Sequence, residues 1–205
     1  MTKINSNKLN ISSDFYSCQG EGISSGVPSY FVRLGTCNLT CGMSRQFANK
    51  LLKEQNLEDG EIFVGDLHAE GKATWTCDST SQWLWRGEDK EFQYLIDRWK
   101  EQGVYDDILN GNIHIIWTGG EPTIKGHQDA ICNFFTYWLS QDKNLVNVYN
   151  EIETNGTVVI NSALFSWINQ INCSPKLSNS GMTAKQRIVP DAIKCIMEHD
   201  NYQFK

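Results

Sequence analysis

The sequence has no long hydrophobic run, no excess of positive charge and no disulfide-like pattern among its cysteines. No stretch of the 205 residues approaches the length of a membrane-spanning helix, and the N-terminus lacks the apolar core of a secretory signal. We therefore expect a cytoplasmic protein with no membrane partner. Lysine and arginine number 18 against 24 aspartates and glutamates, which leaves no broad basic surface for direct nucleic-acid binding.

The cysteines and histidines indicate which disulfide and metal-binding chemistry the chain can have. Seven cysteines are an odd number, and their uneven spacing is not that of a small secreted disulfide scaffold. None of the four histidines stands in a metal-ligand pattern. Metal ligation or burial of the thiols explains the cysteines better than disulfide formation does.

The chain length and its hydrophobic periodicity predict one α/β domain over residues 1–205. Short apolar runs alternate with segments of helical spacing, and this alternation favours parallel strands covered by helices. Strands are expected at 29–34, 114–117, 148–153, 171–173 and from 201 onward, and helices at 44–55, 88–102, 127–140 and 162–170. Most of the tryptophans, Trp99 and Trp138 among them, are expected in the core.

Small or polar residues follow each expected strand, at 37–41, 118–122, 154–156 and 174–176. The carboxyl ends of parallel strands meet at one edge of a sheet, which is where such folds place their chemistry. We therefore expect these four segments to build a single shared site.

Two cysteines, Cys37 and Cys41, lie on one of these segments, and Cys77 is the natural third member of a set. Three thiolates can hold an iron–sulfur cluster and leave one iron open for a chelating ligand. The two nearby cysteines alone leave a zinc site or ordinary buried thiols equally open. Cys132, Cys173 and Cys195 are expected to be buried thiols without a metal.

Longer motifs surround this pair. They are Ser17-Cys-Gln-Gly-Glu-Gly22, Gly26-Val-Pro28, Phe31-Val-Arg-Leu-Gly-Thr-Cys-Asn-Leu-Thr-Cys41, Thr118-Gly-Gly-Glu-Pro122, Glu153-Thr-Asn-Gly156 and Ser174-Pro-Lys-Leu177. In this order, over residues 15–177, the chain resembles the 7-carboxy-7-deazaguanine synthases of the radical S-adenosylmethionine superfamily. The resemblance implies a partial, open barrel of parallel strands covered by helices.

The same resemblance implies the cofactors and their ligands. Cys37, Cys41 and Cys77 would bind a [4Fe–4S] cluster, and Ser79 would bind Mg²⁺. The positions that match contacts to S-adenosylmethionine are Thr76, Cys77, Asp78, Gly119, Gly120, Glu121, Ser174, Pro175 and Lys176. Gly120, which has no side chain, would let the backbone come close to the amino acid part of that cofactor. The positions that match substrate contacts are Cys18, Gln19, Gly20, Glu21, Arg33 and Thr118.

The implied reaction is the radical ring contraction of 6-carboxy-5,6,7,8-tetrahydropterin to 7-carboxy-7-deazaguanine with loss of ammonia, a lyase reaction of queuosine-type 7-deazapurine biosynthesis. An electron donor such as a flavodoxin and a homodimer are also implied. Amide and carboxylate groups can pair with the pterin edge, and Arg33 can bind a carboxylate through two hydrogen bonds. Two alternatives remain: another radical S-adenosylmethionine enzyme such as a glycyl-radical activase, and a non-catalytic iron–sulfur-binding or interaction protein of the same fold.

The chain departs from the family pattern in two places. The family spacing puts the third cysteine two residues after the second, whereas 35 residues separate Cys41 from Cys77 here. We interpret 42–76 as an insertion, which is tolerable because each doubling of loop length costs only about 0.6 kcal/mol. The other departure is at 201–205, which resembles the start of a further strand, so we expect a C-terminus that is truncated relative to the family.

Overall fold

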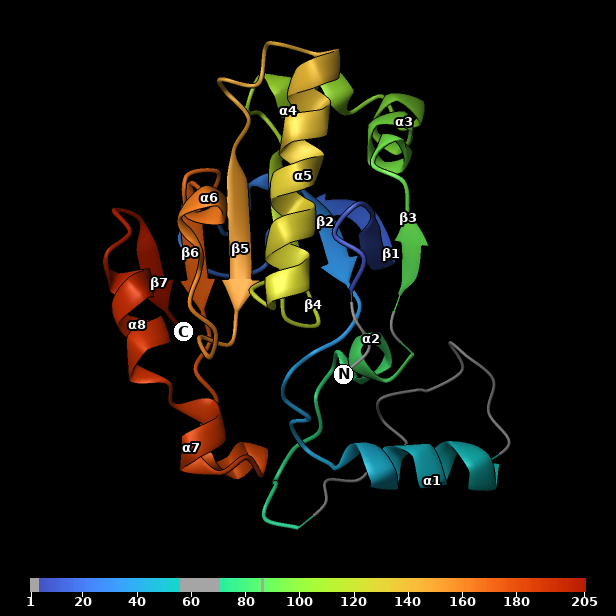
Figure 1. Ribbon diagram of the computed structural model, residues 1–205, viewed down its shortest axis with the longest axis vertical. Helices are drawn as coiled ribbons and strands as arrows, with labels where there is room; N and C mark the ends of the chain where they lie inside the picture. Colours follow the sequence, from blue (N-terminus) through green and yellow to red (C-terminus); the bar gives the residue numbers. More distant parts are fainter. Residues whose placement is uncertain (1–3, 56–70, 86) are drawn as a thin grey trace.

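The computed structural model describes residues 4–55, 71–85 and 87–205, which form an α/β protein. Within these residues, seven strands make one sheet in the order β3-β1-β2-β4-β5-β6-β7 (Figure 1). The strands are β1 (Leu9–Cys18), β2 (Pro28–Leu34), β3 (Glu88–Lys90), β4 (His114–Gly119), β5 (Asn150–Thr154), β6 (Gln170–Cys173) and β7 (Tyr202–Phe204).

The sheet is mixed. Its five strands from β2 to β7 run parallel, as expected from the alternation of strands and helices. The sequence predicts no strand at Leu9–Cys18, and β1 runs there antiparallel to both β2 and β3. A short loop at 19–27 joins β1 to β2, and a parallel connection would need a crossover of about a dozen residues or more.

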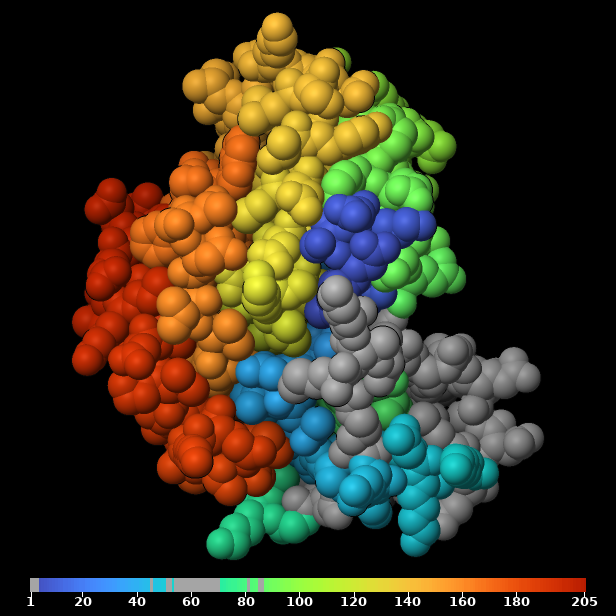
Figure 2. Space-filling view, viewed as in Figure 1, coloured from blue at the N-terminus to red at the C-terminus, as the bar shows by residue number. Residues whose placement is uncertain are grey.

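Helices cover one face of this sheet, with α5 at its centre (Figure 1). In the space-filling view from the same side, the side chains of α5, in yellow, lie between green and orange segments from before and after it (Figure 2). The helices are α1 (Arg45–Gln55), α2 (Thr80–Trp85), α3 (Gln93–Glu101), α4 (Tyr105–Leu109), α5 (Lys125–Gln141), α6 (Ser162–Phe165), α7 (Ala184–Arg187) and α8 (Pro190–Met197), and η2 (Ser178–Ser180) is a 3₁₀ turn. Within the described part of the chain, none is both long and apolar enough to cross a membrane.

Two helices are shorter than the sequence predicts, because backbone pairing in the sheet takes part of each segment. Residues 88–90, expected to begin a helix, form β3 and pair with Leu9–Ile11. The helix expected over 162–170 ends at Phe165, and Gln170 already pairs with Glu151 in the sheet. The strand expected from residue 201 onward is present as β7.

The helices α3, α4, α5, α6 and α8 share one apolar core with the strand side chains beneath them. The helices α1 and α2 pack in a separate, smaller cluster around Ala48 and Trp83. Trp99 and Trp138 are both fully buried, as expected, with ring centroids 5.0 Å apart. Phe134 packs edge-on against Trp99 at 5.8 Å. Offset and edge-on contacts of this kind add to the stabilisation from buried area, so this cluster anchors the helices to the sheet.

The opposite face of the sheet carries polar side chains near the carboxyl ends of the parallel strands. Arg33 on β2 is paired in register with Thr118 on β4. The Thr118 hydroxyl donates a 2.6 Å hydrogen bond to Glu153 on β5. Because successive side chains alternate between the faces of a strand, these three residues stand on the face away from the helices.

Candidate functional site

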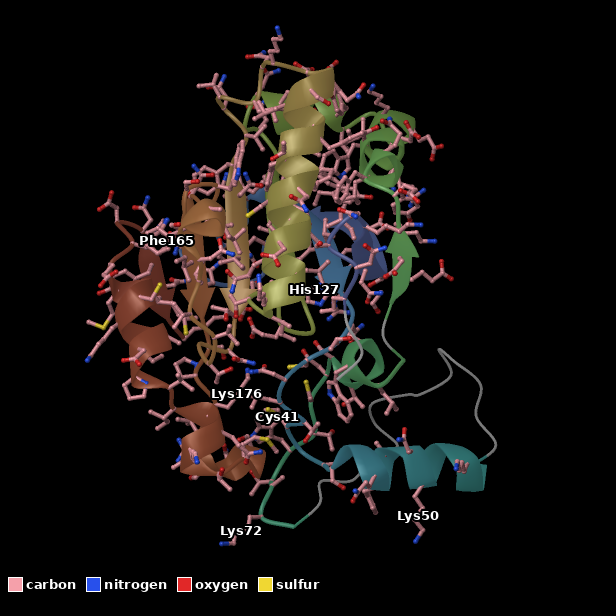
Figure 3. The ribbon with its side chains drawn as sticks, viewed as in Figure 1. Cys41, Lys50, Lys72, His127, Phe165 and Lys176 are labelled. Atoms are coloured by element: carbon pink, nitrogen blue, oxygen red, sulfur yellow. The ribbon has the colours of Figure 1, made fainter. Side chains whose placement is uncertain are left out.

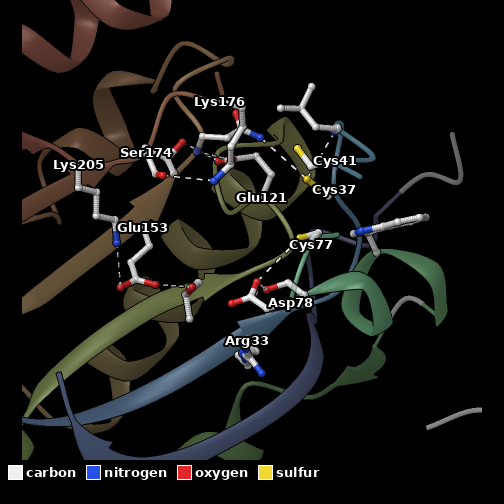
Figure 4. Close-up of a pocket in the computed structure, with 18 of the residues that line it drawn as sticks. Arg33, Cys37, Cys41, Cys77, Asp78, Glu121, Glu153, Ser174, Lys176 and Lys205 are labelled. Carbon is white, nitrogen blue, oxygen red and sulfur yellow. Dashed lines mark hydrogen bonds and ion pairs between the residues drawn. The ribbon is translucent and has the colours of Figure 1, made fainter. Parts of the chain in front are cut away.

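A cavity of about 290 Å³ lies where β2, β4, β5 and β6 end (Figure 4). The segments at all four strand ends contribute to its wall, so the predicted convergence is confirmed. The residues predicted to bind the cluster, Mg²⁺ or S-adenosylmethionine that line it are Cys37, Cys41, Cys77, Asp78, Ser79, Gly119, Gly120, Glu121, Ser174 and Lys176. Thr76 and Pro175, predicted for the same purpose, are not among its lining residues.

The turn before Cys37 is held by neighbouring backbone. Thr36 has a φ of 70°, a left-handed conformation that residues with a side chain rarely adopt. The amide of Gly120 donates to the carbonyl of Leu34 at 2.8 Å, and the amide of Glu121 donates to the carbonyl of Thr36 at 3.0 Å. A Cβ on Gly120 would collide with that Thr36 carbonyl, so the absent side chain is needed for close packing of the protein's own backbone.

Glu121 is almost completely buried, and its carboxylate is fully engaged inside the protein. One oxygen accepts from the amide and hydroxyl of Thr123 at 2.9 and 2.5 Å and from the Thr154 hydroxyl at 2.7 Å. The other accepts from the amide of Asn155 at 2.7 Å. Burial raises the pKa of Glu121 although these hydrogen bonds oppose the shift. Glu121 thus ties the end of β4 to the end of β5.

The three cysteines predicted as cluster ligands share the cavity wall (Figure 4). Burial raises the pKa of Cys37 to about 12, and the nearby Glu121 carboxylate adds to the shift. Burial also raises the pKa of Cys77 to about 11 and that of Cys41. These thiols are protonated at neutral pH without a metal, so metal binding has to release their protons.

Cys41 and Cys77 are neighbours through their backbones, although 35 residues separate them in sequence. The Cys77 amide donates to the Cys41 carbonyl at 3.3 Å, and a Cβ on Gly42 would lie 2.5 Å from Thr76 Cα. The two ends of segment 42–76 therefore lie next to each other at the cavity wall. Part of it forms α1, as the sequence predicts, and residues 56–70 of the expected insertion lie outside the described residues.

The donor set fits an iron–sulfur cluster. Among the residues that the structure describes, no three His, Cys, Asp or Glu side chains are arranged to hold a single ion. Each cysteine of a four-iron cluster binds a different iron, so the ligands surround a shared space instead of meeting at one point. Three thiols on one cavity wall, with soft sulfur donors, match that requirement.

A positively charged side chain, that of Lys176, lies near these thiols in the cavity wall. Lys176 lines the cavity and lies close enough to Cys41 and Cys77 to lower their pKa values in opposition to burial (Figure 4). Its ammonium donates to the Ser174 hydroxyl at 3.2 Å. A cation at this distance favours the thiolate forms that a metal requires. Lys50 and Lys72, by contrast, point away from the cavity (Figure 3).

Three of the four other cysteines lie away from the first cavity. Cys132 packs against the core, and Cys173 is fully buried beside Gly156. The Cys195 thiol donates to the carbonyl of Ile160 at 3.4 Å. None of these three lines the first cavity.

A second cavity of about 410 Å³ lies beside the first and shares Glu21, Arg33, Asp78, Thr118 and Glu153 with its wall. Its other lining residues come mainly from the end of β1 and the loop that follows. All six residues predicted to contact a substrate line it: Cys18, Gln19, Gly20, Glu21, Arg33 and Thr118. The structure therefore brings the two predicted sets together in adjoining spaces.

Arg33 stands at the junction of the two cavities and is not paired. Among the described residues its guanidinium has no hydrogen-bond or ion-pair partner. Glu153 beside it is occupied, since it accepts from Thr118 at 2.6 Å and from the Gln19 amide at 3.3 Å. An unpaired guanidinium in a cavity is suited to an anionic ligand.

The first cavity is also lined by three residues for which the sequence predicts no role: Glu153, Asn155 and Lys205. Lys205 forms ion pairs with Glu21 and, at 3.6 Å, with Glu153. Glu153 and Asn155 belong to the recognised Glu153-Thr-Asn-Gly156 motif, so that motif was the available signal. Nothing in the local sequence distinguishes Lys205 from a surface lysine.

Comparison with known proteins adds to these findings. The chain matches no family model. It is 54% identical over 202 residues to the 7-carboxy-7-deazaguanine synthase of Rickettsia prowazekii, which covers 96% of this chain and 65% of that protein. It is 28% identical over 178 residues to the synthase of Halobacterium salinarum, covering 86% of this chain and 49% of that protein.

A solved structure shows the same fold. The crystal structure of QueE from Escherichia coli superposes with a TM-score of 0.51 and 22% identity, covering 96% of this chain and 71% of that one. Fold and site define an α/β protein with a thiol-lined pocket at the ends of its parallel strands. Its relatives are 7-carboxy-7-deazaguanine synthases, so the predicted resemblance is confirmed. The chain spans about half to two thirds of the length of these curated relatives.

Proposed function

We propose that this chain is a radical S-adenosylmethionine enzyme, a 7-carboxy-7-deazaguanine synthase. It would convert 6-carboxy-5,6,7,8-tetrahydropterin to 7-carboxy-7-deazaguanine with loss of ammonia, as a carbon–nitrogen lyase. The observation that carries the proposal is the pair of adjoining cavities, one with three cysteines and the other with an unpaired arginine. The relatives are named 7-carboxy-7-deazaguanine synthases, which supports the proposed product.

In this proposal Cys37, Cys41 and Cys77 hold a [4Fe–4S] cluster from the wall of the first cavity. When bound, the cluster and S-adenosylmethionine would supply the radical chemistry for the ring contraction of the pterin. The chain contributes the soft thiolate ligands and, through Lys176, a positive charge near Cys41 and Cys77. The raised pKa values of the thiols mean that each ligand loses a proton on cluster assembly.

S-adenosylmethionine would occupy the rest of the first cavity. Gly119, Gly120, Asp78 and Ser174 line this space and would contact the cofactor, with Thr76, Cys77, Pro175 and Lys176 beside them. Glu121 would act through position, because all four of its hydrogen bonds are made inside the protein. It fixes the loops at the ends of β4 and β5 on which the cofactor would rest.

The pterin would occupy the second cavity. Arg33 would bind its carboxylate through two parallel N–H donors, since nothing else in the described structure engages that guanidinium. Gln19, Glu21 and Thr118 would pair with the donors and acceptors of the ring, while Cys18 and Gly20 complete the wall. The adjoining position of the cavities would hold the reacting hydrogen near the radical source and exclude water.

A Mg²⁺ ion would bind at the border of the two spaces. The Ser79 hydroxyl lies 3.2 Å from Asp78 Oδ1, and both residues line the first cavity. Hydroxyl and carboxylate oxygens are the donors that this hard cation prefers, and it retains several water molecules as further ligands. The ion would neutralise the substrate carboxylate together with Arg33.

Several wider features belong to the same proposal. We infer one radical S-adenosylmethionine domain over 1–205, an open barrel in which the sheet curves around the two cavities, and an insertion at 42–76. A flavodoxin-like electron donor, a homodimer and a cytoplasmic location complete it. The parallel strands from β2 to β7 support the barrel. The backbone hydrogen bond between Cys77 and Cys41, at the two ends of segment 42–76, supports the insertion.

The test is anaerobic reconstitution of the full chain with iron and sulfide, followed by incubation with S-adenosylmethionine, the tetrahydropterin and a strong reductant. We expect 5'-deoxyadenosine and 7-carboxy-7-deazaguanine to appear together. Cofactor cleavage without the ring-contracted product would favour another radical S-adenosylmethionine activity such as a glycyl-radical activase. Iron and sulfide binding with no cleavage at all would favour the non-catalytic alternative.

A further inference from the structure

Asn155 is a polar residue of the first cavity wall that touches one of the cysteines. It follows β5 directly and is buried, with 6% of its surface exposed. Its side-chain nitrogen Nδ2 lies 3.9 Å from Cys37 Sγ, within the range of an N–H donor to sulfur, and 3.0 Å from Asn38 Oδ1. The amide therefore reaches both the first cysteine and the residue after it.

The orientation of this amide is fixed by its neighbours. Asn155 Oδ1 accepts from the backbone amide of Thr157 at 3.0 Å and from the Thr157 hydroxyl at 2.5 Å. A backbone N–H can only donate, so the oxygen must face Thr157 and the NH₂ group must face Cys37. The backbone of Asn155 is held as well, because its amide donates to Glu121 at 2.7 Å.

Cys37 differs from the other two cysteines in having a side-chain amide as a donor to its sulfur. Its sulfur also accepts from the backbone amide of Leu39, at 3.4 Å. Within the described part of the chain, the sulfurs of Cys41 and Cys77 receive no hydrogen bond from a side-chain amide. Two N–H groups thus converge on one sulfur, and only one of them belongs to a side chain that can be replaced.

We propose that Asn155 is a positioning residue that donates an N–H to the sulfur of Cys37 and raises the reduction potential of the cluster held there. This inference rests on the proposed function. A donor on a ligating sulfur withdraws negative charge from it, so the reduced cluster, which carries one more electron, gains more stabilisation than the oxidised one. Asn155 would therefore make the electron transfer that starts the reaction easier.

The experiment compares the full chain with Asn155→Ala and with Thr157→Val as a matched control, each reconstituted anaerobically with iron and sulfide. Iron content is measured first, and the midpoint potential and the spectrum of the reduced cluster are then followed by electron paramagnetic resonance during a redox titration. We expect Asn155→Ala to keep its iron, to shift to a more negative potential and to change its spectrum. Thr157→Val loses a hydroxyl but keeps the backbone N–H that orients Asn155, so its potential should match that of the unaltered chain.

Each outcome bears on the proposal. Full iron content with an unchanged potential in Asn155→Ala overturns it. If that variant does not load, Asn155→Leu decides, because it is neutral, of similar size and lacks the donor; an unchanged potential again overturns the proposal. If neither loads while Thr157→Val does, Asn155 is needed for cluster assembly and not for its potential, which overturns the proposal. If Thr157→Val also loses its iron, Asn155 only supports the structure of the loop, and the proposal is overturned.

Measurements on the unaltered chain distinguish a failure of the proposed function from a failure of the role assigned to Asn155. If it binds no iron and sulfide, the proposed function fails and not the assignment of Asn155. If it binds the cluster and cleaves S-adenosylmethionine, the proposed chemistry stands whatever the potential of the variants shows. The midpoint potential thus tests Asn155 independently of activity.

Discussion

The buried imidazole of His127 makes the free energy of unfolding of the chain decrease at acidic pH. His127 lies in the first turn of α5, fully buried, and its Nε2 donates to the carbonyl of Gly35 at 2.5 Å (Figure 3). Because a carbonyl only accepts, Nε2 carries the proton and Nδ1 is bare. Nδ1 is buried and has no partner among the described residues. Protonation would place a charge there, and burial accordingly lowers the pKa of His127 to about 4.

The size of the effect follows from the difference between the folded and unfolded pKa values. The folded pKa of about 4 lies below the ordinary 6.5, so the unfolded chain takes up this proton first as the pH falls. The stability that His127 contributes is complete above about pH 6.5 and decreases toward pH 4. The linkage relation gives a loss of about 2 kcal/mol by about pH 5 and about 3 kcal/mol below pH 4.

Urea denaturation of the cluster-free chain under anaerobic conditions, near neutral pH and near pH 5, measures this loss. The comparison variant is His127→Gln, whose amide nitrogen can still donate to Gly35 but does not titrate. We expect the unaltered chain to lose about 2 kcal/mol more than the variant between the two pH values. Carboxylates contribute equally to both proteins and cancel. An identical pH dependence in the two would refute the assignment of a neutral, buried His127.

Three further predictions concern the site. Cys77→Ala should abolish iron binding while Cys132→Ala retains it, and the reverse result would overturn the ligand assignment. Arg33→Leu should raise the KM for the tetrahydropterin by about 10- to 100-fold, the loss of a charged hydrogen-bond pair, with cofactor cleavage retained; an unchanged KM would contradict a carboxylate contact. Gly120→Ala should lower the unfolding free energy by roughly 1–3 kcal/mol in denaturation, because its Cβ meets the Thr36 carbonyl; full stability would contradict that close packing.

Much of the fold follows from local sequence patterns. The central helix α5 and the strands β2, β4, β5 and β6 are predicted to within a few residues, because hydrophobic periodicity depends only on neighbours along the chain. The errors arise where a distant segment competes for the backbone. Residues 88–90 leave their expected helix to pair with Leu9–Ile11, a contact that no local pattern reveals.

The strand β1 is another such case, because the sequence predicts no strand there. Its alternation of side chains is compatible with either orientation, and the short connection at 19–27 decides for the antiparallel one. The predicted convergence of the strand ends did not depend on this edge, since β2, β4, β5 and β6 are all parallel. The two cavities therefore form where the sequence predicts a site.

The sequence alone determined the residue types at the strand ends, the three cysteines and the family resemblance, because these are properties of position along the chain. Only the tertiary structure decided which groups are engaged and which are free. Arg33 is unpaired, the Glu121 carboxylate is used internally, and Lys205 reaches Glu21 across 184 positions. Likewise Asn155 meets Cys37 only because β5 and β2 end at the same edge of the sheet. Such contacts depend on strand order and register, which are set by long-range pairing.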